Sequence, residues 1–236
     1  MLRPRADWRI LLFETFLARI AAYGVIPLVT LGDSSSADEL AEALIDGGLP
    51  VIEVTFRTSE ALEIIGKMSK RGDLLVGAGT VRTLYQARAA RDSGASFLVS
   101  PGFNDTVVDW AIEQQIPILP GVDSTLGIEM AVAKGLNALK FFPAAASGGP
   151  ARLDALHGPY ADVWFVPTGG IDAANLAQWL ARPAVLACGG SWLVSAKILN
   201  SRKWAEVERL AKEALAIVRH RGNPPLFPSA VSNAGG

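Results

Sequence analysis

The sequence predicts an α/β fold of the (β/α)8 TIM-barrel type with an extra N-terminal helix, and three observations support this prediction. Short runs of apolar or β-branched residues alternate with stretches of helical periodicity from Gly24 onward. Successive runs are mostly about 20 to 25 residues apart, which suits one strand plus one helix. Eight such units fit a small barrel. The main rival is a doubly wound sheet, but Leu31–Ser36 lacks the G-x-G-x-x-G turn expected after its first strand.

Each predicted element follows from this alternation. The apolar runs predict strands at Val25–Thr30, Val51–Phe56, Leu74–Gly77, Phe97–Val99, Ile116–Leu119, Ala138–Phe142, Val163–Val166 and Ala184–Ala187. The helical periodicity predicts helices at Ala37–Asp46, Ser59–Lys70, Leu84–Ser93, Asp105–Gln115, Gly127–Lys134, Ala151–His157, Ala173–Leu180 and Trp204–Val218. Helix-start residues such as Ser36 and helix-stop glycines such as Gly47 flank several of these stretches. No linker interrupts the pattern, so we expect one domain over residues 1–220.

The two ends of the chain carry separate expectations. The uninterrupted apolar run near the start covers only Ile10–Phe13, too short for a signal peptide or a membrane span. Leu12, Phe16 and Ile20, with neighbouring apolar residues, share one helical face, which predicts an amphipathic helix packed on the domain. Residues 221–236 are rich in Pro, Gly and Asn, so we expect a flexible tail.

Composition narrows the classes of partner and cofactor. The chain has 22 basic and 23 acidic residues, so its charge gives no reason to expect nucleic acid or a membrane as partner. One cysteine, Cys188, excludes an internal disulfide, and only two histidines, His157 and His220, disfavour a metal centre. Both histidines are expected at helix ends. The expected protein is cytoplasmic and needs no cofactor.

Two predicted strands carry charged residues that an apolar barrel does not explain. Glu53, Thr55 and Arg57 alternate with apolar residues and are expected to face the interior. Lys140 lies in the middle of another apolar strand, and burial favours its uncharged, nucleophilic amine, as a Schiff base requires. Purely structural ion pairs, Glu53 with Arg57 or with Lys140, are the alternatives. A class I aldolase needs such a lysine–carboxylate pair in any case.

Glycine-rich segments follow several strands at the end where barrels place their active sites. Gly77–Thr80 and Ser100–Gly102 could bring backbone close to a ligand, and Thr80 could bind a small carboxylate. The paired glycines of Pro167–Ile171 and Cys188–Trp192 match the phosphate site common after strands seven and eight. Tight turns without a ligand are the alternative at each place. Cys188 is interpreted as a small buried residue and not as a nucleophile.

Six segments in order resemble the bacterial KDPG/KHG aldolase family, whose substrates are 2-keto-3-deoxy-6-phosphogluconate and 2-keto-4-hydroxyglutarate. They are Val51–Thr58, Gly77–Val81, Ser100–Gly102, Leu139–Ala144, Pro167–Ile171 and Gly189–Leu193. The resemblance implies a metal-independent class I aldolase on a (β/α)8 barrel, usually a homotrimer. It implies that Lys140 is the Schiff-base lysine and Glu53 the general acid/base. The other site residues implied by position are Arg57 and Thr80 for the pyruvate carboxylate, Pro101 and Phe142 for the pyruvate pocket, and Gly169, Gly170, Gly190 and Ser191 for the phosphate.

The resemblance has departures. Ala145 stands where the family often has Glu, and Ser124 and Gly127 stand where it tends to have Thr and Glu. The function implied is reversible cleavage of 2-keto-3-deoxy-6-phosphogluconate to pyruvate and glyceraldehyde 3-phosphate, with 4-hydroxy-2-oxoglutarate as a second candidate substrate. The galactonate epimer, a non-catalytic phosphosugar-binding barrel and a phosphate-binding isomerase or synthase remain alternatives.

Overall fold

The computed structural model describes the backbone of residues 7–221 and the side chains of residues 12–221. The predicted tail, apart from Arg221, lies outside the described residues. Within them the strands are β1 (Val25–Val29), β2 (Val51–Thr55), β3 (Leu75–Gly79), β4 (Phe97–Val99), β5 (Ile118–Leu119), β6 (Gly121–Val122), β7 (Ala138–Phe141), β8 (Trp164–Pro167) and β9 (Cys188–Gly190).

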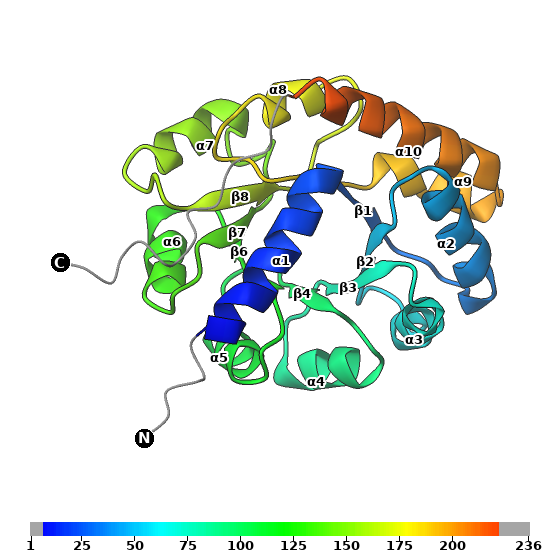
Figure 1. Cartoon of the computed structure of the whole chain (residues 1–236), viewed down its shortest axis with the longest axis horizontal. Coiled ribbons are helices and arrows are strands. Elements are labelled where there is room, and N and C mark those ends of the chain that lie inside the picture. Colours follow the sequence, from blue (N-terminus) through cyan, green and yellow to red (C-terminus); the bar gives the residue numbers. More distant parts are fainter. Residues whose placement is uncertain (1–6, 222–236) are drawn as a thin grey trace.

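The helices form the outer layer of the molecule (Figure 1). They are α1 (Asp7–Tyr23), α2 (Ala37–Asp46), α3 (Ala61–Arg71), α4 (Leu84–Asp92), α5 (Asp105–Glu113), α6 (Thr125–Val132), α7 (Gly149–His157), α8 (Leu176–Leu180), α9 (Ala196–Asn200) and α10 (Trp204–Arg219), with short 3₁₀ turns η1 (Ser34–Ser36) and η2 (Trp192–Val194).

All strand pairs are parallel, and their order excludes the doubly wound alternative. One sheet has the order β5-β4-β3-β2-β1-β9 and the other the order β6-β7-β8. From β1 to β5 each strand lies beside the previous one, whereas a doubly wound sheet reverses direction at a switch point. Isolated parallel bridges, Phe165 with Val185 and Thr168 with Gly189, connect β8 to the segment that contains β9. The parallel strands thus form at least a half-barrel, surrounded by helices.

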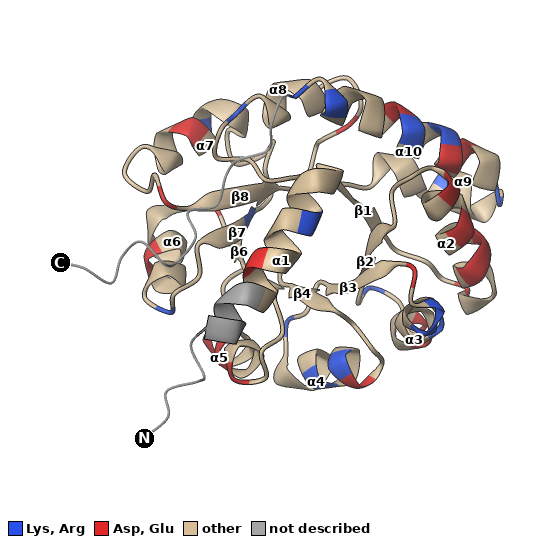
Figure 2. Ribbon diagram, in the orientation of Figure 1, with Lys and Arg blue, Asp and Glu red and all other residues tan. Residues whose placement is uncertain are grey.

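The core lies between the strands and the apolar faces of the outer helices. Helix α3 buries Ala61, Ile64, Ile65 and Met68, the spacing of one helical face. Most charged residues lie on the outer helices and connecting segments (Figure 2). Two charged residues, Glu53 and Lys140, are instead buried inside the strand layer. Such burial requires a partner or a function.

Helix α1 is the predicted amphipathic N-terminal helix, and it packs against the amino-terminal ends of the strands. The Phe16 ring lies 5.0 Å from the ring of Phe97, the first residue of β4. Leu17 and Ile20 are fully buried, whereas Leu12, expected on the same face, stays 48% exposed. Figure 1 shows α1 crossing the middle of the strand layer. None of the helices in residues 7–221 is long and apolar enough to cross a membrane.

Three of the differences from the sequence prediction have a local reason. The predicted strand Ile116–Leu119 is shorter and resumes as β6 beyond Pro120, which has no N–H to donate to a ladder. The predicted last strand, Ala184–Ala187, pairs with β8 only through the isolated bridge between Val185 and Phe165, and the ladder with β1 starts at Cys188. Arg221, assigned to the tail, is half-buried and donates from Nη1 to the Leu186 carbonyl at 2.6 Å.

Candidate active site

The centre of the site is a contact between Lys140 and Glu53 across the interior. Lys140 is the third residue of β7, and Glu53 is the third residue of β2, in the other sheet. The Lys140 Nζ donates to Glu53 Oε1 at 3.3 Å, and the two side chains are 6% and 3% exposed. The predicted pair is therefore formed by residues 87 positions apart. Glu53 pairs with Lys140, so the predicted alternative pairing with Arg57 is not what the structure has.

Glycines on β3 make room for this pair. A Cβ at Gly79 would overlap the Glu53 carboxylate, and a Cβ at Gly77 would overlap the ring of Phe97. Close approach of backbone to a ligand was one of two interpretations of these strand-end glycines, but their nearest neighbours are side chains of the strand layer itself. Gly79 therefore permits the position from which Glu53 reaches Lys140.

Phe142 forms a wall beside the lysine. Its ring centroid lies 5.4 Å from Lys140 Nζ, within the range of a cation–π contact, and the residue is half-buried directly after β7. Pro101 is half-buried at the end of the strand β4 segment, and its carbonyl approaches the backbone of Gly121 so closely that a Cβ there would overlap it. Both residues thus lie after the carboxyl ends of strands, and they are the two that the family resemblance assigns to the pyruvate pocket.

Arg57 and Thr80 lie just beyond the ends of β2 and β3. The strand alternation that predicted an inward Arg57 does not reach it, because β2 ends at Thr55 and the Arg57 N–H donates to the Thr55 carbonyl at 2.8 Å in a tight turn. Arg57 is exposed and has no ion-pair partner among residues 12–221. Thr80 has φ +58°, a left-handed conformation that is rare for a β-branched residue. Such strain is concentrated at ligand sites.

The loop after β8 carries two glycines in left-handed conformations. Gly169 has φ +103° and Gly170 φ +75°, so both need the freedom of glycine. The loop is tied to the segment after β7, where Ala145 N donates to the Gly169 carbonyl at 3.0 Å. The backbone N–H group of Gly170 has no hydrogen-bond partner in the described part of the chain.

Gly190 and Ser191 lie at the end of β9, next to this loop. Thr168 of the first loop bridges to Gly189 of the second, so the two predicted phosphate segments lie side by side. Ser191 is exposed, and its N–H has no partner within residues 7–221. Gly190 has a packing role as well, because a Cβ there would overlap the Trp192 ring.

The other candidate groups lie away from this centre. Cys188 is fully buried, and burial raises the pKa of its thiol, so at neutral pH it is a protonated, unreactive side chain. His157 ends α7 and His220 caps α10, where its Nδ1 lies 2.7 Å from the Ala216 carbonyl. No group of three potential metal ligands is present among the described residues.

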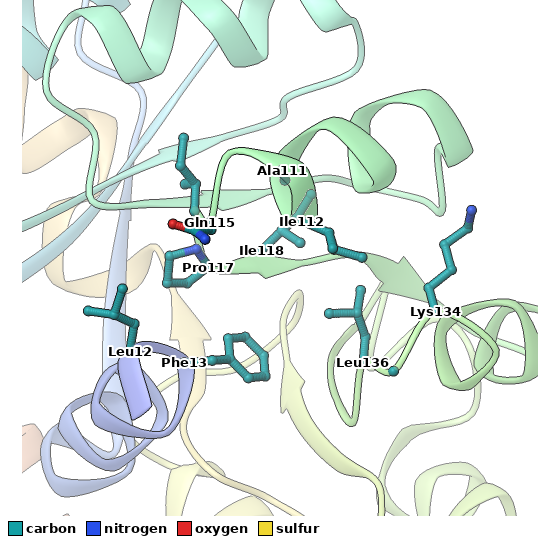
Figure 3. A pocket seen from close by; sticks show the side chains of 11 residues that line it. Leu12, Phe13, Ala111, Ile112, Gln115, Pro117, Ile118, Lys134 and Leu136 are labelled. Atoms are coloured by element: carbon teal, nitrogen blue, oxygen red, sulfur yellow. The ribbon is translucent and has the colours of Figure 1, made fainter. Parts of the chain in front are cut away.

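A pocket occurs at the opposite end of the molecule (Figure 3). It is formed by Leu12 and Phe13 of α1, the end of α5, the first residue of β5 (Ile118), and residues that precede β5 and β7, including Pro117 and Leu136. Residues before parallel strands lie at their amino-terminal ends, whereas barrel chemistry takes place at the carboxyl ends. This pocket is therefore separate from the Lys140–Glu53 pair.

Comparison with known proteins decides the family. The family model "KDPG and KHG aldolase" matches residues 17–210. The chain belongs to the KDPG and KHG aldolase family. It is 48% identical to a 2-dehydro-3-deoxy-phosphogluconate aldolase of Treponema pallidum over 82% of this chain and 93% of that protein. It is 39% identical to the KHG/KDPG aldolase of Escherichia coli K12 over 81% and 90% of the two chains.

A solved structure of the KDPG and KHG aldolase family adds chemistry to this similarity. The KDPG aldolase of Legionella pneumophila matches with a TM-score of 0.82 and 37% identity, over 84% of this chain and 97% of that one. It was captured with pyruvate as a covalent carbinolamine intermediate. Members of this family are aldolases that act through a Schiff base with pyruvate.

Three polar residues at the carboxyl ends of strands, Thr30, Thr55 and Ser100, were not predicted as site residues from the sequence. Thr55 is buried, and its hydroxyl lies 2.8 Å from that of Thr30. Ser100 is buried and donates to the Gly102 carbonyl at 2.8 Å. Thr55 could have been selected because it shares the Glu53 face of its strand. Thr30 gives no such signal, because nothing in its own strand marks it as more than the end of an apolar run.

Proposed function

We propose that this protein is a class I aldolase that reversibly cleaves 2-keto-3-deoxy-6-phosphogluconate to pyruvate and glyceraldehyde 3-phosphate. The observation that carries the proposal is the buried Lys140–Glu53 pair, because it places an amine and a carboxylate within one hydrogen bond of each other. A binding protein has no need for a buried lysine of this kind. An isomerase or a synthase that works without a Schiff base has no use for an amine nucleophile in its interior.

The proposed reaction starts at the ketone of the substrate. The uncharged Lys140 amine adds to C2 and forms a carbinolamine, which loses water to give an iminium ion. Glu53 takes a proton from the C4 hydroxyl, directly or through a water, while the C3–C4 bond breaks. The bond electrons pass into the iminium as an enamine, and glyceraldehyde 3-phosphate leaves. Protonation of the enamine at C3 and hydrolysis then release pyruvate and the free amine.

We assign the other site residues to three parts of the substrate: the carboxylate, the methyl end of the pyruvate half, and the phosphate. Arg57 and Thr80 would bind the pyruvate carboxylate. Arg57 offers an unpaired guanidinium at the end of β2, and Thr80 has a strained backbone at the end of β3. Phe142 and Pro101 would enclose the methyl end. The unpartnered N–H groups of Gly170 and Ser191 and the exposed Ser191 hydroxyl, with Gly169 and Gly190 next to them, would bind the phosphate at the ends of β8 and β9.

We also propose the finer structural and cellular assignments. Since only Pro120 separates β5 from β6, the two count as one interrupted strand and complete a (β/α)8 barrel, closed by the bridges between β8 and β9. A cytoplasmic homotrimer is proposed. Leu126 and Met130, exposed one turn apart on α6, offer an apolar strip for contact between copies. Light scattering during gel filtration tests the trimer.

A retro-aldol assay tests the activity. Purified protein is given 2-keto-3-deoxy-6-phosphogluconate, its galactonate epimer or 4-hydroxy-2-oxoglutarate, and released pyruvate is measured. We expect the gluconate to give the highest kcat/KM. The highest rate on the epimer or on hydroxyoxoglutarate would reassign the substrate within the same chemistry. No pyruvate from any of the three, together with no borohydride-trapped pyruvate adduct, would refute the aldolase assignment.

Removal of divalent metal should leave this activity unchanged. The whole sequence has two histidines and one cysteine, and the lysine–carboxylate pair supplies the electrophile as an iminium ion. We expect the kcat of protein dialysed against excess EDTA to equal that of untreated protein. Activity that falls on dialysis and returns with added Mg²⁺, Mn²⁺ or Zn²⁺ would contradict the proposed chemistry.

The phosphate end is best tested at Ser191. Gly190→Val is a poor probe, because its side chain would displace Trp192 whatever the loop binds. We expect Ser191→Ala to lower kcat/KM about tenfold, or ~1.4 kcal/mol, for aldol addition of pyruvate to glyceraldehyde 3-phosphate, because it removes the hydrogen bond from the Ser191 hydroxyl to the charged phosphate and leaves the backbone N–H groups in place. Addition to glyoxylate, which has no phosphate, serves as the control and should change less than twofold. Equal losses on both aldehydes would place the phosphate elsewhere.

A further inference from the structure

Two threonine hydroxyls meet at the carboxyl ends of β1 and β2. Thr30 follows β1 directly and Thr55 is the last residue of β2, and their Oγ1 atoms lie 2.8 Å apart. The register pairs Leu28 with Glu53, so Thr30, two residues further along, lies beside Thr55 on the Glu53 side of the sheet. Thr55 is 2% exposed, whereas Thr30 is exposed. Thr30 therefore covers Thr55 at the open end of the strand layer.

The direction of these hydrogen bonds follows from counting protons. A threonine hydroxyl has one proton to donate and two lone pairs that accept. Thr55 Oγ1 donates to the Val29 carbonyl at 2.9 Å, and a carbonyl can only accept. The proton between the two hydroxyls must therefore come from Thr30. The Thr30 proton is therefore used in the hydrogen bond to Thr55, and the Thr30 oxygen can only accept a hydrogen bond from the solvent-exposed side.

The position of Thr30 lies between the reactive pair and the proposed phosphate loops. In the sheet, β1 lies between β2, which carries Glu53, and β9, which leads to Ser191. The 3₁₀ turn η2 that follows Ser191 packs against β1. A substrate with its C2 at Lys140 and its phosphate at the β8 and β9 ends would bring its intermediate carbons past the end of β1.

We propose that Thr30 determines substrate specificity by accepting a hydrogen bond from the substrate hydroxyl between the reacting carbon and the phosphate. In 2-keto-3-deoxy-6-phosphogluconate this is the C5 hydroxyl, which derives from the C2 hydroxyl of glyceraldehyde 3-phosphate. The proposal rests on the proposed aldolase function. The Thr55 contact holds the Thr30 oxygen as an acceptor, so a hydroxyl donor fits it and an ether or a second acceptor does not. A site built for a hydroxyl discriminates against the analogue without it.

The test combines a change in the protein with a change in the substrate. Aldol addition of pyruvate is measured with glyceraldehyde 3-phosphate and with 3-oxopropyl phosphate, which lacks only the hydroxyl. We expect Thr30→Val to lose about tenfold in kcat/KM with the first aldehyde and less than twofold with the second. Thr30→Ser keeps the hydroxyl and should retain the wild-type preference.

Three other outcomes overturn the inference. Equal losses of Thr30→Val on both aldehydes would make the threonine pair a structural tie between strands. No loss on either aldehyde would remove Thr30 from substrate recognition. A Thr30→Ser variant as impaired as Thr30→Val would make the methyl group the important element. Borohydride trapping of pyruvate by the wild-type protein is measured alongside, since its absence would refute the aldolase function and not the specificity of Thr30.

Discussion

Lys140→Met is expected to abolish both turnover and covalent trapping of pyruvate by borohydride. Methionine has a similar length and fits an apolar strand, but it has no amine to form the carbinolamine. We expect kcat to fall by at least about 10⁴-fold, equivalent to ~5.5 kcal/mol of transition-state stabilisation. Mass spectrometry after borohydride treatment should show one reduced pyruvate adduct on the wild-type protein and none on the variant.

The same variant should also lose stability. Its Glu53 carboxylate, 3% exposed, remains buried without the partner that lies 3.3 Å away in the wild type. Removing one member of a buried pair costs about 3–5 kcal/mol in the free energy of unfolding. The double variant Lys140→Met/Glu53→Gln is the matched control, because it removes both charges and should recover part of that loss without regaining activity. Normal trapping by a folded Lys140→Met protein would disprove the Schiff-base assignment.

The sequence was sufficient to predict the buried Lys140–Glu53 pair because both residues violate the pattern around them. Lys140 interrupts an apolar strand and Glu53 alternates with apolar residues in another, so each is conspicuous without its partner. Their contact is a long-range property, set by the strand layer that brings β2 and β7 together. The period-2 rule that placed Glu53 and Thr55 correctly failed at Arg57, because a strand's end is set by local hydrogen bonds and not by periodicity.

Glycines show a second limit of the sequence. Glycine-rich strand ends predicted backbone near a ligand, and the positive φ angles of Gly169 and Gly170 agree with a loop of special conformation. Gly79, Gly121 and Gly190 have another reason for lacking a side chain. Each allows another residue to pack closely against the backbone. Glu53 packs against Gly79, Pro101 against Gly121, and Trp192 against Gly190. Whether a glycine is needed for its backbone conformation or for close packing depends on its neighbours in space, and these cannot be read from a single sequence.

Two roles fit the position of Glu53, that of a proton-transfer group and that of a counter-ion for Lys140. A counter-ion would only hold the lysine, whereas a general base must also take protons from carbon and oxygen. Glutamine has the same shape and keeps an oxygen that can accept from Lys140 Nζ, but its amide cannot take up a proton at neutral pH. Glu53→Gln thus separates the two roles, because it retains the hydrogen bond and removes the base.

We expect Glu53→Gln to reduce kcat for cleavage by about 10²–10⁴-fold, the range of general acid–base catalysis. Pyruvate should still be trapped by borohydride after long incubation, since Lys140 is intact. Enamine formation needs a proton to leave the pyruvate methyl group, so exchange of that methyl group with D₂O, followed by NMR, should slow by a similar factor. Glu53→Asp, with its carboxylate withdrawn by one methylene, should lie between wild type and glutamine in both assays. Methyl exchange at the wild-type rate in Glu53→Gln would show that another group moves this proton and that Glu53 serves only to position Lys140.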